Sequence, residues 1–237
     1  MTQTVLHRAD TRGHANHGWL DTHHSFSFAD YYDSSRMGFG ALRVLNDDII
    51  APGMGFGTHP HADMEIITIP LEGDLEHRDS MGNGTIIKSG DIQVMSAGTG
   101  IRHSEFNPNR DKYTNLLQIW IIPNTTGATP RYDQITLVPK HSENTFEQII
   151  SPNPEGAGIW IHQDAWFHIG KFDSGKTIEY SFKKPANGLY IFVISGSLEI
   201  ENITLETRDG IGIWDTNHIS MKMLANSRIL LMEVPMR

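Results

Sequence analysis

The chain has 237 residues, of which 38% are hydrophobic and 20% are charged, as is typical of a globular protein and not of a disordered one. Its formal net charge of −9 argues against direct binding to nucleic acid or to an anionic membrane surface. The absence of cysteine excludes disulfides, thiolate metal ligands and cysteine nucleophiles. No apolar signal-like stretch opens the chain and no run approaches the roughly 18 residues of a membrane span, so we expect a cytoplasmic protein.

Short segments with strand character recur along the whole chain. They are rich in β-branched or aromatic residues, and glycines and prolines separate them at intervals of roughly ten residues. This rhythm predicts an all-β sandwich or barrel fold with few, short helices. The clearest segments are residues 66–69, 116–122, 189–194 and 229–234.

The first element of interest is the stretch from residue 14 to residue 28, which is rich in histidine and aromatic side chains. One interpretation is that it covers the mouth of a barrel and lines an aromatic pocket. The other is that its aromatic residues fill the core, which we favour for Phe26 and Phe28 because large apolar side chains are usually buried. The stretch contains His14, His17, Trp19, His23, His24, Phe26 and Phe28.

Next along the chain are two pairs of metal-binding side chains, His59-x-His61 and His103-x-Glu105. On a β-strand, positions i and i+2 project from the same face, so two adjacent strands can direct three imidazoles and one carboxylate at a single point. Glycines precede both pairs and permit the sharp turns that bring strand ends together. They are Gly53, Gly55 and Gly57 before the first pair, and Gly98 and Gly100 before the second.

Such a ligand set suits one divalent first-row metal ion, either Fe, Mn, Co, Ni, Cu or Zn, without selecting among them. A six-coordinate ion held by four side chains keeps two positions for water, O2 or substrate, which is typical of a catalytic site and not of a structural one.

Glu65 is the competing carboxylate, because it has the same strand parity as His59 and His61. A strand rises roughly 3.3 Å per residue, which places Glu65 about 13 Å from His61 along a regular strand. Strand geometry therefore favours Glu105 as the fourth ligand and leaves Glu65 as the alternative.

The second half of the chain repeats features of the first. Residues 71–76 are similar in pattern to residues 194–199, and residues 89–94 to residues 209–214, which suggests two copies of one β-fold. The second copy lacks the two pairs and has only the isolated His218, so we interpret it as a scaffold. Prolines concentrate between the copies. We therefore predict a metal-binding domain over residues 1–130, a linker region over 131–158 and a degenerate domain over 159–237.

A family resemblance carries these inferences further. Gly53-x5-His59-x-His61-x3-Glu65 resembles the first motif of the cupins, and residues 90–107 resemble the second, with Ser96 in place of the usual proline. The second motif also has its histidine two residues late. Both departures are features of the pirins, and the chain closely resembles the bacterial pirin-like quercetin 2,3-dioxygenases. The segments that carry this resemblance are residues 12–21, 26–29, 57–61, 72–73, 76–80 and 96–105.

The resemblance implies a bicupin of two β-sandwich or jelly-roll barrels, with the metal in the N-terminal one. It implies His59, His61, His103 and Glu105 as the metal ligands and excludes Glu65. The implied reaction is O2-dependent opening of the flavonol heterocycle with release of carbon monoxide, so the expected partners are a small aromatic substrate and O2.

In that reaction Glu105 would serve as ligand and catalytic base, with Glu65 as the alternative base or as a hydrogen-bond partner of a ligand imidazole. Two alternative functions stay open. One is a metal-dependent co-regulator that binds a protein partner, as pirins outside bacteria do, and the other is a cupin enzyme for another small enol or aromatic compound.

Overall fold

The computed structural model describes residues 2–137 and 143–236, and within them it is built almost entirely of β-strands. The helical element in this part of the chain is one 3-10 turn, Ala9–Thr11. The all-β prediction is therefore confirmed. The four clearest predicted segments lie in β6, β11, β17 and β22 respectively, except that residue 122 follows the end of β11 at Ile121. No helix among the described residues is long and apolar enough to cross a membrane.

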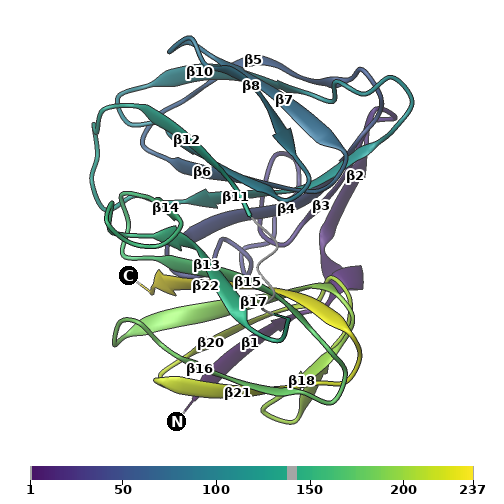
Figure 1. The fold of residues 1–237 in the computed structure, drawn as a ribbon, viewed down its shortest axis with the longest axis vertical. Helices are drawn as coiled ribbons and strands as arrows, with labels where there is room; N and C mark the ends of the chain where they lie inside the picture. The colour runs from purple at the N-terminus through teal and green to yellow at the C-terminus, as the bar shows by residue number, and fades with distance from the viewer. Residues whose placement is uncertain (1, 138–142, 237) are drawn as a thin grey trace.

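The first half of the chain forms a seven-stranded sheet that faces a four-stranded sheet, drawn in blue and teal in the upper part of Figure 1. In spatial order the larger sheet contains β12 (Arg131–Thr136), β9 (Asp91–Ser96), β6 (Glu65–Glu72), β11 (Thr114–Ile121), β4 (Leu42–Ile50), β3 (Leu20–His24) and β2 (Gly13–Asn16). The smaller sheet contains β5 (Gly55–His61), β10 (Ile101–Phe106), β7 (Asp74–Asp79) and β8 (Gly84–Lys88).

The second half repeats this arrangement, with a larger and a smaller sheet. The larger sheet contains β1 (Gln3–His7), β20 (Gly210–Trp214), β17 (Asn187–Ser195), β22 (Ser227–Pro235), β15 (Trp166–Phe172), β13 (Phe146–Ser151) and β14 (Ile159–Trp160). The smaller sheet contains β16 (Thr177–Ser181), β21 (His218–Met223), β18 (Leu198–Ile200) and β19 (Ile203–Leu205).

The internal repeat has a structural counterpart in its turns. Gly73 joins β6 to β7 and Gly196 joins β17 to β18, and both have positive φ angles, of 73° and 88°. A side chain at either position would meet backbone atoms of a neighbouring segment, so glycine is required there for conformation and for space.

The two larger sheets pack face to face between the two barrels, and the largest apolar cluster lies between them. This cluster draws Ile67 and Ile119 from the first half and Phe167 and Leu230 from the second. One strand from the predicted N-terminal domain also belongs to a sheet of the second half. In Figure 1 the purple strand β1 lies in the lower barrel, where it pairs with β20.

The predicted linker region, residues 131–158, contains two complete strands. β12 pairs with β9 of the first half, and β13 pairs with β15 of the second. Residues 138–142 of this region lie outside the described residues. The division of the chain by residue number stays a prediction, and the change of sheet membership falls between β12 and β13.

The interiors of the two barrels differ in chemistry. An extensive apolar cluster, including Leu189, Ile191 and Met221, fills the C-terminal barrel. Among the described residues, the interior of the N-terminal barrel contains two small apolar clusters. Much of its interior is instead occupied by buried polar side chains such as Thr68 and Gln93. Buried polar groups are costly unless they have partners, so this contrast directs attention to the first barrel.

Candidate metal centre

Three of the four predicted ligands converge where β5 and β10 pair in the smaller sheet. The antiparallel register places His59 opposite His103, and His61 lies two residues further along β5. The ring centroids of His59 and His103 are 4.4 Å apart, and those of His61 and His103 are 4.9 Å apart. Ligand nitrogens of the three imidazoles all lie within 4.8 Å of one another. This spacing allows the three nitrogens to bind one ion.

Glu105 lies next to this triad and forms a second group with His103 and His77. One ligand atom from each of these three residues lies within the same 4.8 Å limit. The register of β10 against β5 shifts between His103 and Glu105, so the pairing is irregular at this point. His103 is common to both groups and links Glu105 to His59 and His61.

Two side chains from the opposite sheet hold the Glu105 carboxylate. Gln118 Nε2 donates to both carboxylate oxygens, at 3.1 and 3.0 Å, and Thr68 Oγ1 lies 3.4 Å from Oε1. Gln118 and Thr68 are cross-strand partners on β11 and β6, so the larger sheet forms a polar platform beneath the carboxylate. Charge-assisted hydrogen bonds of this kind fix the orientation of a carboxylate.

The environment of His103 suits a metal ligand. Its side chain is buried, and neither ring nitrogen has a hydrogen-bond partner among the described residues. Burial, followed by the effects of His59 and His77, lowers the pKa of His103 to about 3. Burial, followed by the effects of His103 and His59, lowers the pKa of His61 to about 4. Both imidazoles are therefore neutral at neutral pH, which is the form that binds metals.

Glu65, the competing carboxylate, is engaged elsewhere. Its Oε2 accepts a hydrogen bond from Ser96 Oγ at 2.6 Å, and its Oε1 lies 2.9 Å from His162 Nδ1. Glu65 is absent from the groups of described residues that could hold a metal. Its partner His162 follows β14, so Glu65 connects the first barrel to the second half of the chain.

Sequence reasoning missed His77, a buried residue of β7 that lies against His103 with ring centroids 5.3 Å apart. His77 Nε2 is 3.2 Å from Asp79 Oδ2, whereas Nδ1 is buried without a partner among the described residues. The signal was present in the sequence, because His77-x-Asp79 has the same i, i+2 spacing as the two predicted pairs.

Gly55 makes the close pairing of β5 with β10 possible. A Cβ added there would lie 2.2 Å from the carbonyl oxygen of Glu105 and 2.5 Å from Cα of Phe106. Gly55→Ala should therefore push the two strands apart, reduce the free energy of unfolding by about 1–3 kcal/mol and weaken metal binding. Gly57→Ala is the matched control, because no atom lies within 4 Å of its added Cβ. Thermal unfolding and metal titration of both variants test this, and equal behaviour of the two would contradict it.

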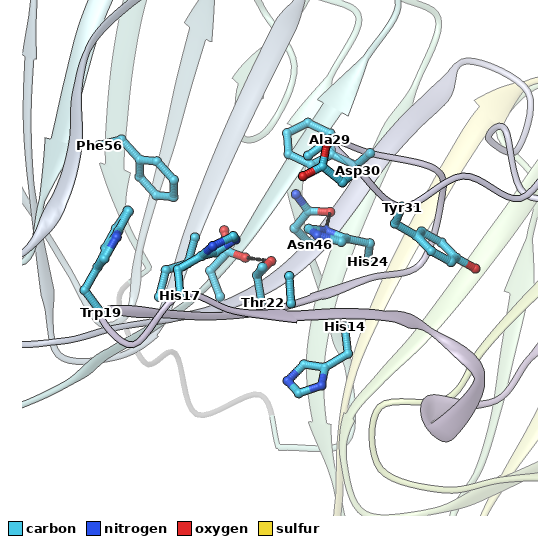
Figure 2. Close-up of a pocket in the computed structure, with 14 residues that line it drawn as sticks. His14, His17, Trp19, Thr22, His24, Ala29, Asp30, Tyr31, Asn46 and Phe56 are labelled. Carbon is cyan, nitrogen blue, oxygen red and sulfur yellow. Dashed lines mark hydrogen bonds between the residues drawn. The ribbon is translucent and has the colours of Figure 1, made fainter.

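A pocket of about 540 Å³ opens between β2, β3, β4 and the loop after β3, and none of the four predicted ligands lines it. Figure 2 shows Trp19 and Phe56 together on one side of it and Tyr31 on the other. The rings of Trp19 and Phe56 meet edge to face at 5.2 Å, and Phe56 lies 6.5 Å from the ring of His59. Phe56 thus links the pocket to the triad.

The predicted roles of the aromatic stretch divide between the two interpretations. Phe26 is fully buried in the cluster between the barrels, as expected. The core prediction is wrong for Phe28, which lines the pocket and packs edge to face on Trp120 at 5.3 Å. A short bridge between Phe28 and Tyr31 turns this segment toward the pocket.

The floor of the pocket is polar. His24 Nδ1 lies 2.8 Å from Asn46 Oδ1 (Figure 2). Thr22 Oγ1 donates a hydrogen bond to Asp48 Oδ1. Burial raises the pKa of Asp48 to about 7, with smaller contributions from Asp47 and Glu105. A carboxyl group that can hold a proton near neutral pH therefore lines the cavity.

The architecture and this site define the class of the protein as a bicupin with a candidate metal centre in its N-terminal barrel. The chain belongs to the pirin family. Residues 5–121 match the family model for pirin, and residues 148–234 match that for the quercetinase C-terminal cupin domain.

Several relatives are similar to this chain over nearly their whole length. Quercetin 2,3-dioxygenase of Escherichia coli strain K12 is 44% identical over 97% of this chain and 98% of its own. A pirin-like protein of Caulobacter vibrioides is 40% identical over 94% and 96%. The crystal structure of the bacterial pirin YhhW from Escherichia coli in complex with nickel(II) has a TM-score of 0.93 and 43% identity, covering 98% of this chain and 99% of that one. These comparisons confirm the predicted bicupin fold and support a divalent metal ion as cofactor.

Proposed function

We propose that this protein is a metal-dependent dioxygenase that opens the heterocycle of flavonols such as quercetin with O2 and releases carbon monoxide. The observation that supports this most directly is His103, a buried imidazole with two unpartnered nitrogens beside two further imidazoles and a carboxylate. The name of the relative from Escherichia coli strain K12 supports the choice of substrate class.

The proposed metal ligands are His59, His61, His103 and Glu105. Their donor set, three neutral nitrogens and one carboxylate oxygen, fits a divalent first-row ion. When bound, such an ion lowers the proton affinity of an enol oxygen and supplies the Lewis-acid and O2 chemistry that the reaction requires. Nickel is the ion named in the crystal structure of the bacterial pirin YhhW, and that supports a divalent metal here without selecting one.

The residues of the chain would position the substrate and move its proton. Trp19 and Phe56 form one wall of the pocket and suit a flat aromatic ring. Glu105 would accept the proton of the flavonol 3-hydroxyl, and Gln118 and Thr68 would keep its carboxylate oriented while it does so. Asp48, when protonated, would donate a hydrogen bond to a second oxygen of the substrate.

Anaerobic titration of the metal-loaded protein with quercetin, followed by addition of O2, tests this proposal. We expect a change in the flavonol absorption spectrum on binding, and then consumption of flavonol and O2 with one carbon monoxide released per turnover. If flavonol binds and neither O2 nor flavonol is consumed, the dioxygenase proposal is wrong. That result would favour the co-regulator function with a protein partner. Turnover of a different enol or aromatic compound would keep the enzyme class and change the substrate.

A further inference from the structure

We propose that the β2–β3 hairpin carries a second metal site, formed by His14, Asp21 and His23, for a divalent ion such as Zn²⁺, Ni²⁺ or Cu²⁺. In the antiparallel register His14 is opposite His23, and Asn16 is opposite Asp21. Because side chains alternate along a strand, these four residues project from one face of the hairpin. The site shares no residue with the buried centre, although His14 is also among the residues that line the proposed substrate pocket.

The distances fit a single small ion. Asp21 Oδ1 is 2.9 Å from His14 Nε2 and 3.8 Å from His23 Nδ1, and the three ligand atoms lie within 4.8 Å of one another. Zinc bonds to nitrogen and oxygen are about 2.0–2.1 Å long, so neighbouring ligand atoms in a tetrahedral site are about 3.3 Å apart. The two distances to Asp21 Oδ1 therefore differ from the tetrahedral value by only about 0.4 and 0.5 Å.

The neighbouring groups arrange these ligands in advance. Asn16 Nδ2 donates to Asp21 Oδ2 at 3.2 Å, which leaves Oδ1 facing the two imidazoles. Asn16 is itself fixed, because its Oδ1 accepts a hydrogen bond from the backbone nitrogen of Gly18 at 2.8 Å. The rings of His14 and His23 are stacked, with centroids 4.4 Å apart and an angle of 17° between planes. A carboxylate held from behind is typical of metal-ligand support.

The site is accessible and lies beside the proposed substrate pocket. The side chains of His14, Asp21 and His23 are 51%, 36% and 35% exposed, so an ion and the water that completes its coordination can enter. Figure 2 shows His14 across the strand from Thr22, and both residues line the pocket. Because β2 is the edge strand of the larger sheet, a bound ion would join the two strands at the pocket rim.

Titration of chelator-treated protein with Zn²⁺, measured by isothermal titration calorimetry, tests the proposal. The parent should show two classes of site with a total of two ions per chain. His23→Gln and Asp21→Asn should each abolish one class of Zn²⁺ site, or lower its affinity by more than the roughly 10- to 100-fold that is typical when a supporting residue is replaced. The other class of site should be unchanged in both variants. Because all three ligands are partly exposed, the melting temperatures of the metal-free variants should equal that of the parent.

His218→Gln is the matched control. His218 Nε2 forms an exposed pair with Glu179 Oε2 at 2.6 Å, but no third ligand atom joins that pair among the described residues. This variant should keep both classes of site. A single class in the parent would overturn the proposal, as would unchanged stoichiometry and affinity in His23→Gln. A loss in His218→Gln equal to that in His23→Gln would also overturn it, because it would assign the weaker class to surface histidines in general.

Discussion

Replacing His103 with leucine should abolish metal binding and, in the same variant, stabilise the metal-free protein by about 1–3 kcal/mol. The expected gain arises because both ring nitrogens of His103 are buried without partners among the described residues, and such groups cost about that much when unsatisfied. Leucine fills a comparable volume and has no polar atoms. Replacing a residue that stabilises the fold would instead lower the free energy of unfolding. The combination of lost metal binding and higher stability therefore identifies a ligand.

Metal titration and urea unfolding of the chelator-treated protein measure the two effects. His168→Leu is the matched control, because His168 is a buried histidine of the C-terminal barrel whose Nδ1 also lacks a partner among the described residues. It should leave metal binding intact. A His103→Leu variant that binds metal as the parent does, or that unfolds more readily without metal, would contradict the assignment.

The metal-free parent should lose stability relative to Asp48→Asn as the pH rises from about 4 to 7. The pKa of Asp48 is raised from 3.8 to about 7 in the folded state. The folded state therefore retains a proton that the unfolded chain releases near pH 4. Its stabilising contribution is complete below that pH and disappears as the pH passes through about 7. A shift of three pKa units corresponds to on the order of 4 kcal/mol.

Asparagine at position 48 resembles the protonated acid, and its amide oxygen can still accept the hydrogen bond from Thr22. The variant should therefore be more stable than the parent above pH 7, as measured by urea unfolding over a pH series. Asp47→Asn is the contrasting control. Asp47 is buried against Arg12 and Arg208, so neutralising it should destabilise the protein and leave the pH-dependent loss in place. If the free energies of unfolding of Asp48→Asn and the parent change with pH in parallel, the role of Asp48 is refuted.

Local periodicity was enough to predict that His59, His61 and His103 lie close together. The i, i+2 spacing of His59-x-His61 and of His103-x-Glu105 required only that each pair lie on a strand, and β5 and β10 are adjacent in the smaller sheet. The choice of Glu105 over Glu65 also followed from strand geometry. The structure agrees to the extent that Glu65 is bound to Ser96 and His162, whereas Glu105 lies beside His103.

The surroundings of the site could not be predicted, because they depend on register between strands distant in sequence. Gln118 and Thr68 reach Glu105 only because β11 and β6 pair with those two residues opposite each other. Asp48 becomes a pocket residue through the pairing of β4 with β3, which places it opposite Thr22. Single positions such as these have no periodic pattern, and only the assembled sheet brings them together.

The sharing of strands and core between the barrels means that this chain is not modular. β1 belongs by sequence to the first half and by pairing to the second, where Arg8 and Ala9 just beyond it also bond to Asp209. Cutting the chain between the halves would remove an edge strand from one barrel and expose the apolar face of both larger sheets. Exposed apolar faces and unpaired strand edges promote aggregation. The barrel without the two ligand pairs therefore supplies half of the apolar core that the other barrel needs to bury its larger sheet.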